Sequence, residues 1–137
     1  MKRRLILLVL VMLLCFTAAA EEVKLTTALP QETLDAFLAE YGDYGPPAFE
    51  VTEDEKADIY AMPIAEVAGK AQELQVILLS PETVIWRAGG EDAPAVKALT
   101  VDGKLYGYPL DEENALVIDP ACPDVGWAML LCQFVMP

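Results

Sequence analysis

The sequence is 137 residues long, 55% hydrophobic and 23% charged, which fits one domain and excludes a disordered acidic tail. Its 22 acidic and 9 basic residues give a net charge of −13, which argues against a nucleic-acid partner because a phosphate backbone is also negative. The sequence contains no histidine, so histidine-based catalysis and histidine-ligated metal sites are excluded, and we expect neither a metal nor another cofactor.

The first twenty residues have the pattern of a secretory signal peptide. Three bases at 2–4 precede an unbroken apolar run at 5–14, and three alanines end at Ala20. The run is shorter than the ~20 residues of a membrane span, and the leucine before Cys15 does not suit lipidation there. We expect cleavage after Ala20 and export to the periplasm or the extracellular space. Removing the three bases from the 9 leaves 6 against 22 acids, a net charge of −16.

The rest of the chain alternates strand-like and helix-like segments, which predicts an α/β domain over residues 21–119, with a central sheet, flanking helices and a hairpin. In chain order we expect a strand at 23–28, a helix at 30–41, strands at 49–52 and 57–61, a helix at 64–71, a buried strand or packed crossing segment at 74–79, helices at 81–88 and 94–98, a hairpin at 99–106 and a strand at 115–118. The charged residues 53–56 lack the spacing of a calcium loop and are expected to be solvated.

The clearest turn signal is Asp102-Gly103, which lies between two β-prone runs. Asp-Gly favours a type I′ turn because both central residues take positive φ angles. Tyr106 and Tyr108 are two residues apart, so we expect both rings on one face of this hairpin, as an aromatic pair covering the core. Trp86 follows an apolar stretch of a predicted helix and is also expected in the core.

Residues 120–137 form a nearly uncharged tail that contains only one charged side chain, Asp124. The tail fits either a truncated or shifted reading frame, or a further strand or helix that seals an exposed edge of the domain. Cys122 and Cys132 lie ten residues apart. They are either a small disulfide-closed loop, which export would permit, or two buried free thiols.

The run from Gly103 to Glu113 (GKLYGYPLDEE) resembles the GKLYG-x-P stretch of the extracellular solute-binding proteins of ABC importers, the maltose-binding-like family. Weaker matches follow in the family's order, at residues 21–25, 40–42, 57–59 and 79–82. The resemblance covers most of residues 21–119. Family members are longer and have two lobes with a ligand cleft between them, so the resemblance implies a partial periplasmic-binding-protein-like first lobe.

The resemblance implies an exported protein that captures a small solute, sugar-like or cationic, for ABC permease partners. Glu113 aligns with a ligand-contacting acid of the family, although a solvated loop carboxylate is the alternative. Met62 falls where sugar-binding members often have an aromatic, and Ala65 where some have an acid, so both weaken a sugar-binding interpretation. We expect the ligand surface where two strand ends converge, at Met62, Asp111, Glu112, Glu113 and Asn114.

An enzymatic role is not expected from these residues. The acids cluster in loops, and none stands alone among apolar neighbours, where burial would raise its pKa for acid catalysis. The alternative to solute capture is a small secreted acidic α/β domain that acts through a protein–protein interaction.

Overall fold

The structure is a computed structural model that describes residues 23–53 and 57–137. The predicted signal peptide, its cleavage site, Cys15 and part of the charged loop lie outside the described residues. The elements are β1 (Lys24–Thr27), α2 (Gln31–Tyr41), the 3₁₀ helix η1 (Gly42–Tyr44), β2 (Ala48–Val51), β3 (Ile59–Pro63), α3 (Ile64–Val67), the 3₁₀ helix η2 (Ala68–Glu73), α4 (Pro81–Arg87), α5 (Pro94–Leu99), β4 (Thr100–Val101), β5 (Lys104–Leu105), β6 (Tyr108–Pro109), β7 (Asn114–Ile118) and α6 (Val125–Val135).

A five-stranded mixed sheet forms the centre of the fold, in the order β2-β1-β3-β7-β6. Strand β1 pairs in parallel with both β2 and β3, whereas β7 is antiparallel to both β3 and β6. Strands β1, β2, β3 and β6 therefore run in one direction, and their carboxyl ends lie at the same edge of the sheet. The predicted α/β fold with a central sheet and flanking helices is confirmed.

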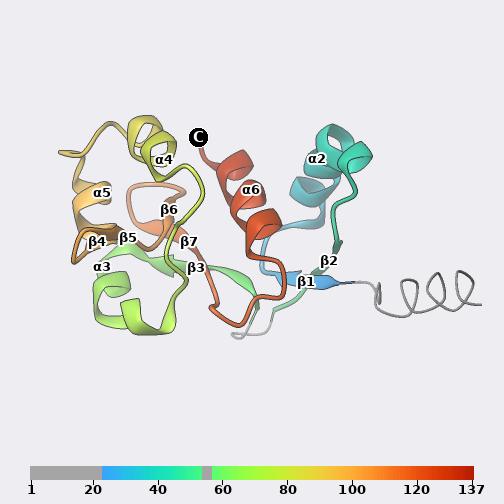
Figure 1. Cartoon of the computed structure of the whole chain (residues 1–137), viewed down its shortest axis with the longest axis horizontal. Coiled ribbons are helices and arrows are strands. Elements are labelled where there is room, and N and C mark those ends of the chain that lie inside the picture. Colours follow the sequence, from blue (N-terminus) through green and yellow to red (C-terminus); the bar gives the residue numbers. More distant parts are fainter. Residues whose placement is uncertain (1–22, 54–56) are drawn as a thin grey trace, which may run out of the picture.

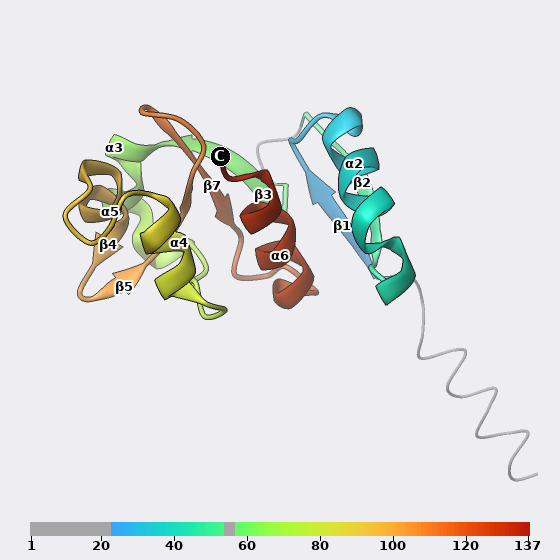
Figure 2. The ribbon, with the colours of Figure 1, turned by 90° about the horizontal axis from the view of Figure 1, so that it is seen from above.

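Helices cover the sheet on both sides. Figure 1 shows α2 and α6 on one side and α3 with η2 on the other, and Figure 2 shows α2 and α6 next to each other. Phe37 joins these two helices, since its ring lies 6.2 Å from that of Trp127 and 5.4 Å from that of Phe134, between centroids. The buried face of α2, at Leu34 and Phe37, follows the helical spacing seen in the sequence.

The nearly uncharged tail forms a helix that belongs to the core. The carboxylate of Asp124 accepts the backbone N–H of Trp127 at 3.2 Å, which caps the start of α6. Arg87 of α4 donates two 2.7 Å hydrogen bonds to carbonyl oxygens at the other end, those of Gln133 and Met136. Of the alternatives for this tail, the structure contains a helix, and it covers a face of the sheet rather than an edge.

Both cysteines of the tail are buried free thiols in this structure. Cys132 is completely buried among apolar side chains, and Cys122 is 6% exposed. Burial raises the pKa of both thiols, because it disfavours the charged thiolate. The second of the two alternatives for the pair, free thiols, is the one that the structure contains.

The predicted hairpin is present, and its turn has the expected geometry. Thr100 pairs with Leu105 and Val101 with Lys104, and the φ angles of Asp102 and Gly103 are +51° and +78°. Positive φ at both central residues defines the primed turn that Asp-Gly predicts.

The prediction that Tyr106 and Tyr108 share one face of this hairpin is wrong. The chain leaves the hairpin after β5, and Tyr108 pairs with Leu116 in the other sheet, where its side chain is fully buried. The crossing occurs at Gly107, whose missing Cβ would lie 3.3 Å from the carbonyl oxygen of Leu116 and 3.2 Å from the Leu99 side chain. Close approach to β7 therefore separates the two tyrosines.

Trp86 was predicted in the core, but its side chain is 78% exposed. Helix α4 is only seven residues long and buries Val84. Because successive helical residues rotate by about 100°, Trp86 lies about 200° around the helix from Val84 and faces the opposite side. The apolar stretch therefore predicts the helix correctly but does not predict the exposure of the Trp86 side chain.

The apolar run at 74–79 is a crossing segment and not a strand of either sheet. Its backbone N–H groups at Gln75 and Ile77 donate to the carbonyl oxygens of Ile118 and Leu105, each at 2.8 Å. Leu74 and Ile77 are buried, whereas Leu78 is 71% exposed. The segment therefore links the two sheets and buries only part of its apolar side chains.

Candidate functional site

The parallel part of the sheet has a topological switch point between β1 and β3. The connection after β1 leads through α2 to β2 on one side, whereas the connection after β3 leads through α3 toward β6 and β7 on the other side. In open α/β sheets, ligands bind beyond the carboxyl ends of the strands at such a point, because the connecting segments diverge there. We therefore expect a binding site at the edge formed by the carboxyl ends of β1, β2 and β3.

Strand β3 extends beyond β1 at this edge. The two strands share one register pair, Thr27 with Ile59, and the Ala28 N–H donates to the Ile59 carbonyl at 3.0 Å. At the other end of the contact, the Asp58 carboxylate accepts the Thr26 N–H at 2.9 Å, which fixes the pairing. Residues 60–63 of β3 continue without β1 beside them, so a step is left in the sheet.

A surface hollow of about 480 Å³ lies at this step, and we call it the strand-end hollow. Its walls come from the ends of β1 and β2, from β3, and from α3 and η2: Ala28, Glu53, Tyr60, Ala61, Met62, Pro63, Glu66, Lys70 and Glu73. Its volume is within the roughly 300–1,000 Å³ typical of small-molecule sites.

The pairing of β3 with β7 brings the first predicted site residues together. Met62 pairs with Ala115 and Pro63 with Asn114. The next backbone N–H, that of Ile64, donates to the Glu113 carbonyl at 2.8 Å. The end of β3 and the start of β7 therefore converge, although their sequences lie some fifty residues apart.

Asp111 shapes the turn between β6 and β7. One of its carboxylate oxygens accepts the backbone N–H groups of Glu113 and Asn114, at 2.8 and 2.7 Å. These hydrogen bonds favour the charged form and lower the pKa of Asp111 below its ordinary value. Since the side chain is exposed and directed to its own turn, the structure gives Asp111 a role in forming the loop.

The predicted site residues do not share one hollow. Met62 lines the strand-end hollow. Glu112 and Glu113 instead line a neighbouring hollow beside α5, and Asp111 lines another. Asn114 lies at the register position opposite Pro63.

Sequence reasoning missed the charged residues that line the strand-end hollow. Glu66, Lys70 and Glu73 follow β3 at spacings of four and three, which places side chains on one face of a helix. That spacing was visible in the sequence. What it could not show was that this face turns toward the strand ends.

The strand-end hollow is mainly acidic. Glu53, Glu66 and Glu73 line it together with one base, Lys70. Burial, with smaller contributions from the charges of Asp119 and Glu73, raises the pKa of Tyr60 above its ordinary value. Its hydroxyl therefore stays protonated at neutral pH and can donate a hydrogen bond to a ligand.

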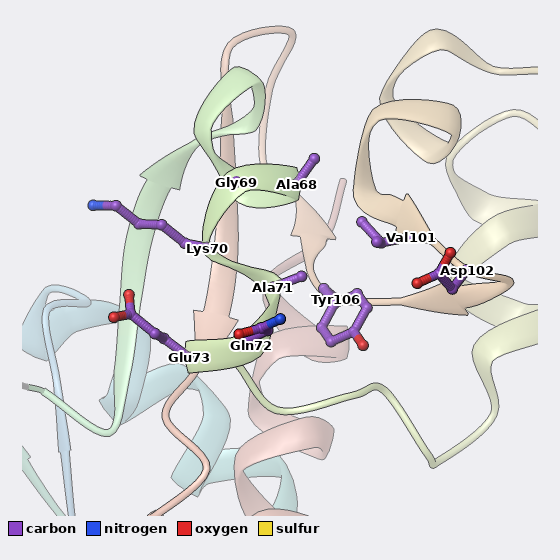
Figure 3. Close-up of a pocket in the computed structure, with 9 residues that line it drawn as sticks. All are labelled: Ala68, Gly69, Lys70, Ala71, Gln72, Glu73, Val101, Asp102 and Tyr106. Atoms are coloured by element: carbon purple, nitrogen blue, oxygen red, sulfur yellow. The ribbon is translucent and has the colours of Figure 1, made fainter.

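A separate hollow of about 580 Å³ lies between η2 and the β4–β5 hairpin. Figure 3 shows the Tyr106 ring facing the small side chains of η2, while Lys70 and Glu73 point away from the hairpin. Asp102 is the one charged side chain on the hairpin side of this hollow. Lys70 and Glu73 line both hollows, but their side chains point away from the hairpin, so we regard the strand-end hollow as the stronger candidate site.

Within residues 23–53 and 57–137, no group of three Cys, Asp or Glu side chains is placed to hold a metal ion. None of the helices in these ranges is long and apolar enough to cross a membrane. No protein-family model, curated protein or solved structure matches the chain.

Proposed function

We propose that this chain is a binding module that captures a small neutral or cationic solute at the strand-end hollow, as the exported solute-binding component, or first-lobe part, of an ABC importer. The observation that carries the proposal is the position of the hollow. It lies beyond the carboxyl ends of β1 and β2 and beside the last residues of β3, at the switch point of the sheet. The resemblance of the GKLYG-x-P run to solute-binding proteins supports it, since that run contains β5 and β6 and is followed by the turn that leads to Asn114, which pairs with Pro63 in the wall of the hollow.

The chemistry of the walls favours polyhydroxylated or amine-bearing solutes. Three carboxylates can accept hydrogen bonds from hydroxyl or ammonium groups, and Tyr60 and Lys70 can donate. The exposed side chains of Ala61 and Pro63 add an apolar surface against which a sugar face or a methylene chain can pack, while Met62 in the same wall is only 6% exposed. The excess of acids disfavours an anionic solute by like-charge repulsion.

Binding, rather than catalysis, suits this inventory. The one serine of the chain, Ser80, does not line the hollow, and the chain has no histidine to activate a nucleophile. Because the hollow is open to solvent, it buries less of a ligand than the roughly 70–90% typical of tight small-molecule sites. We therefore expect weak binding, which a second covering surface would strengthen.

The proposal is tested by calorimetric titration with maltotriose, glucosamine trimer, spermidine and citrate. We expect saturable binding of at least one of the first three and none of citrate. Glu66→Ala and Glu73→Ala should weaken that binding. The matched control Glu40→Ala removes the same charge from α2, away from the hollow, and should leave it unchanged. Saturable citrate binding, or equal effects of Glu40→Ala and Glu66→Ala, would contradict the proposal.

A second candidate function is protein–protein interaction by a secreted acidic domain. It is favoured by exposed apolar side chains, since Trp86 is 78% and Leu78 71% exposed. If this second function is correct, none of the solutes should bind in the titrations, and the exposed apolar side chains should instead contact a partner protein.

A further inference from the structure

Two more surface hollows lie beside the β6–β7 turn and are continuous with each other. Their volumes are about 580 and 470 Å³, and both are lined by Pro94, Ala95 and Glu112. One extends from these residues toward Pro109 and Leu110, and the other toward Pro63, Ile64, Ala65 and Ala98. We call the two together the α5 groove.

The floor of the α5 groove is apolar and made of small side chains. Helix α5 contributes Ala95 and Ala98, and α3 contributes Ala65. These three are partly or fully exposed, whereas their neighbours Val96 and Leu99 are buried. Alanines at these positions leave room above the helix that longer side chains would fill, so the groove can receive side chains of another molecule.

One rim of the groove carries three consecutive exposed carboxylates, those of Asp111, Glu112 and Glu113. None of them forms an ion pair, since the ion pair present in the described ranges joins Lys24 and Glu50. The backbone N–H groups of the turn hold Asp111 in place and favour its charged form. The rim therefore has a fixed negative charge that no cation among the described residues neutralises through an ion pair.

The one base that lines this groove already donates hydrogen bonds to another element. Arg87 lines the groove, but its two terminal nitrogens donate to the carbonyl oxygens of Gln133 and Met136, each at 2.7 Å. These contacts direct the guanidinium toward the end of α6. The charge of the groove is thus left to be balanced by a cationic partner.

We propose that the α5 groove docks an extended basic segment of a partner protein, in which Lys or Arg side chains alternate with small apolar ones. The apolar side chains occupy the space above Ala95 and Ala98, and the cationic ones reach the carboxylates of the rim. A second copy of this chain and an anionic membrane fit less well, since both present negative charge to a negative rim. The groove shares only Pro63 with the strand-end hollow, so this proposal stands apart from solute capture.

The test measures fluorescence anisotropy of labelled nonapeptides on the mature chain. The basic probe is AKPLKAPKL, and its matched counterparts replace each lysine by glutamine or glutamate. Binding is measured at ionic strengths of about 20 and 150 mM, because screening separates charge from apolar contact. We expect saturable binding of the basic peptide, weakened by salt, and none of the acidic one.

Two kinds of variant separate the charge of the rim from the shape of the floor. The double variant Glu112→Gln, Glu113→Gln should weaken the basic peptide about three- to tenfold, as expected for two partly exposed ion pairs. Ala95→Leu fills the space above the floor of the groove without changing its charge, and it should also weaken binding of the basic peptide. The controls are Glu32→Gln with Glu40→Gln, and Ala39→Leu, all on α2, and each should leave binding unchanged.

Any of three results overturns the proposal: no binding of the basic peptide, equal binding of the three peptides, or the same loss in groove and control variants. Circular dichroism and the thermal midpoint of each variant establish that it is folded. If Ala95→Leu does not fold, the glutamine double variant alone decides, because its exposed side chains carry no part of the core.

Discussion

Replacing Tyr108 by phenylalanine should stabilise the fold, because the hydroxyl that it removes is buried and has no hydrogen-bond partner in the structure. The ring itself is fully buried against β7 and is kept by the substitution. Burying a hydroxyl without a hydrogen-bond partner lowers the free energy of unfolding by about 1–3 kcal/mol. We use the lower end of this range because the surrounding structure can relax around the hydroxyl. We expect a gain of about 1 kcal/mol, which corresponds to about 3–6 °C in the midpoint for a domain of this size.

The pH dependence of the same pair of proteins gives a second readout. Burial raises the pKa of Tyr108 far above its ordinary value. Above about pH 10 the tyrosine ionises in the unfolded chain but not in the folded one, so the wild type loses stability as pH rises, by up to about 1.4 kcal/mol per unit. The phenylalanine variant lacks this loss, and its advantage should widen above pH 10.

Urea unfolding followed by circular dichroism measures both effects. Tyr44→Phe makes the same chemical change at a side chain that is 75% exposed, and it should leave stability unchanged within about 0.5 kcal/mol. A loss of 1 kcal/mol or more in Tyr108→Phe would refute the reasoning, since it would mean that the hydroxyl has a partner worth more than its burial costs.

Four further substitutions or measurements test local features. Gly103→Val should cost about 1–3 kcal/mol in urea unfolding because of the +78° φ angle alone, since no atom lies within 4 Å of the added Cβ; a neutral effect would exclude the primed turn. Trp86→Ala should change stability by less than about 0.5 kcal/mol, and a larger loss would restore this side chain to the core. Cys122 and Cys132 should react with a thiol reagent in the unfolded chain and not in the folded chain. If the unfolded chain did not react, the two cysteines would form a disulfide. Rapid reaction of the folded chain would contradict their burial. Burial raises the pKa of Cys132, so above about pH 9 the thiol ionises in the unfolded chain but not in the folded one. The folded chain should therefore lose stability as pH rises above about 9, and faster amide exchange of α6 would report this loss.

Features governed by a few neighbouring residues could be predicted from the sequence. Asp102-Gly103 forms the expected turn, since positive φ angles depend on the residues of the turn themselves. The helix predicted at 81–88 ends just before Gly89-Gly90: the N–H of Gly90 donates to the Ile85 carbonyl at 2.9 Å, and that of Gly89 to the Trp86 carbonyl at 3.2 Å. Both motifs satisfy backbone groups locally, so no distant contact is needed to read them.

Features that depend on which face meets the core could not be predicted as well. The apolar run at 74–79 has no period that distinguishes a strand from a crossing segment, and its hydrogen bonds go to two different sheets. Trp86 lies on a helix too short for its periodicity to show which side is buried. The separation of Tyr106 from Tyr108 depends on the close contact at Gly107, which involves β7 and α5.

The candidate site was predicted in part. The convergence of Met62 with Asn114 follows from two strands whose ends meet, and the sequence placed both segments after predicted strands. The division of the acids among separate hollows depends on the Asp111 turn and on the position of α5, which the sequence does not reveal. Lys70 and Glu73 were missed because the helix after β3 continues as a 3₁₀ helix that turns toward the strand ends.

The most direct test of solute capture at the strand-end hollow is methyl NMR of the mature chain labelled at methionine. The described residues contain three methionines: Met62 in the wall of the hollow, and two core residues, Met129 within α6 and Met136 at its C-terminal end. Titration with maltotriose, glucosamine trimer or spermidine should shift the Met62 methyl signal saturably and leave those of Met129 and Met136 in place. Saturable shifts confined to Met129 and Met136, with Met62 unchanged, would contradict binding at this hollow.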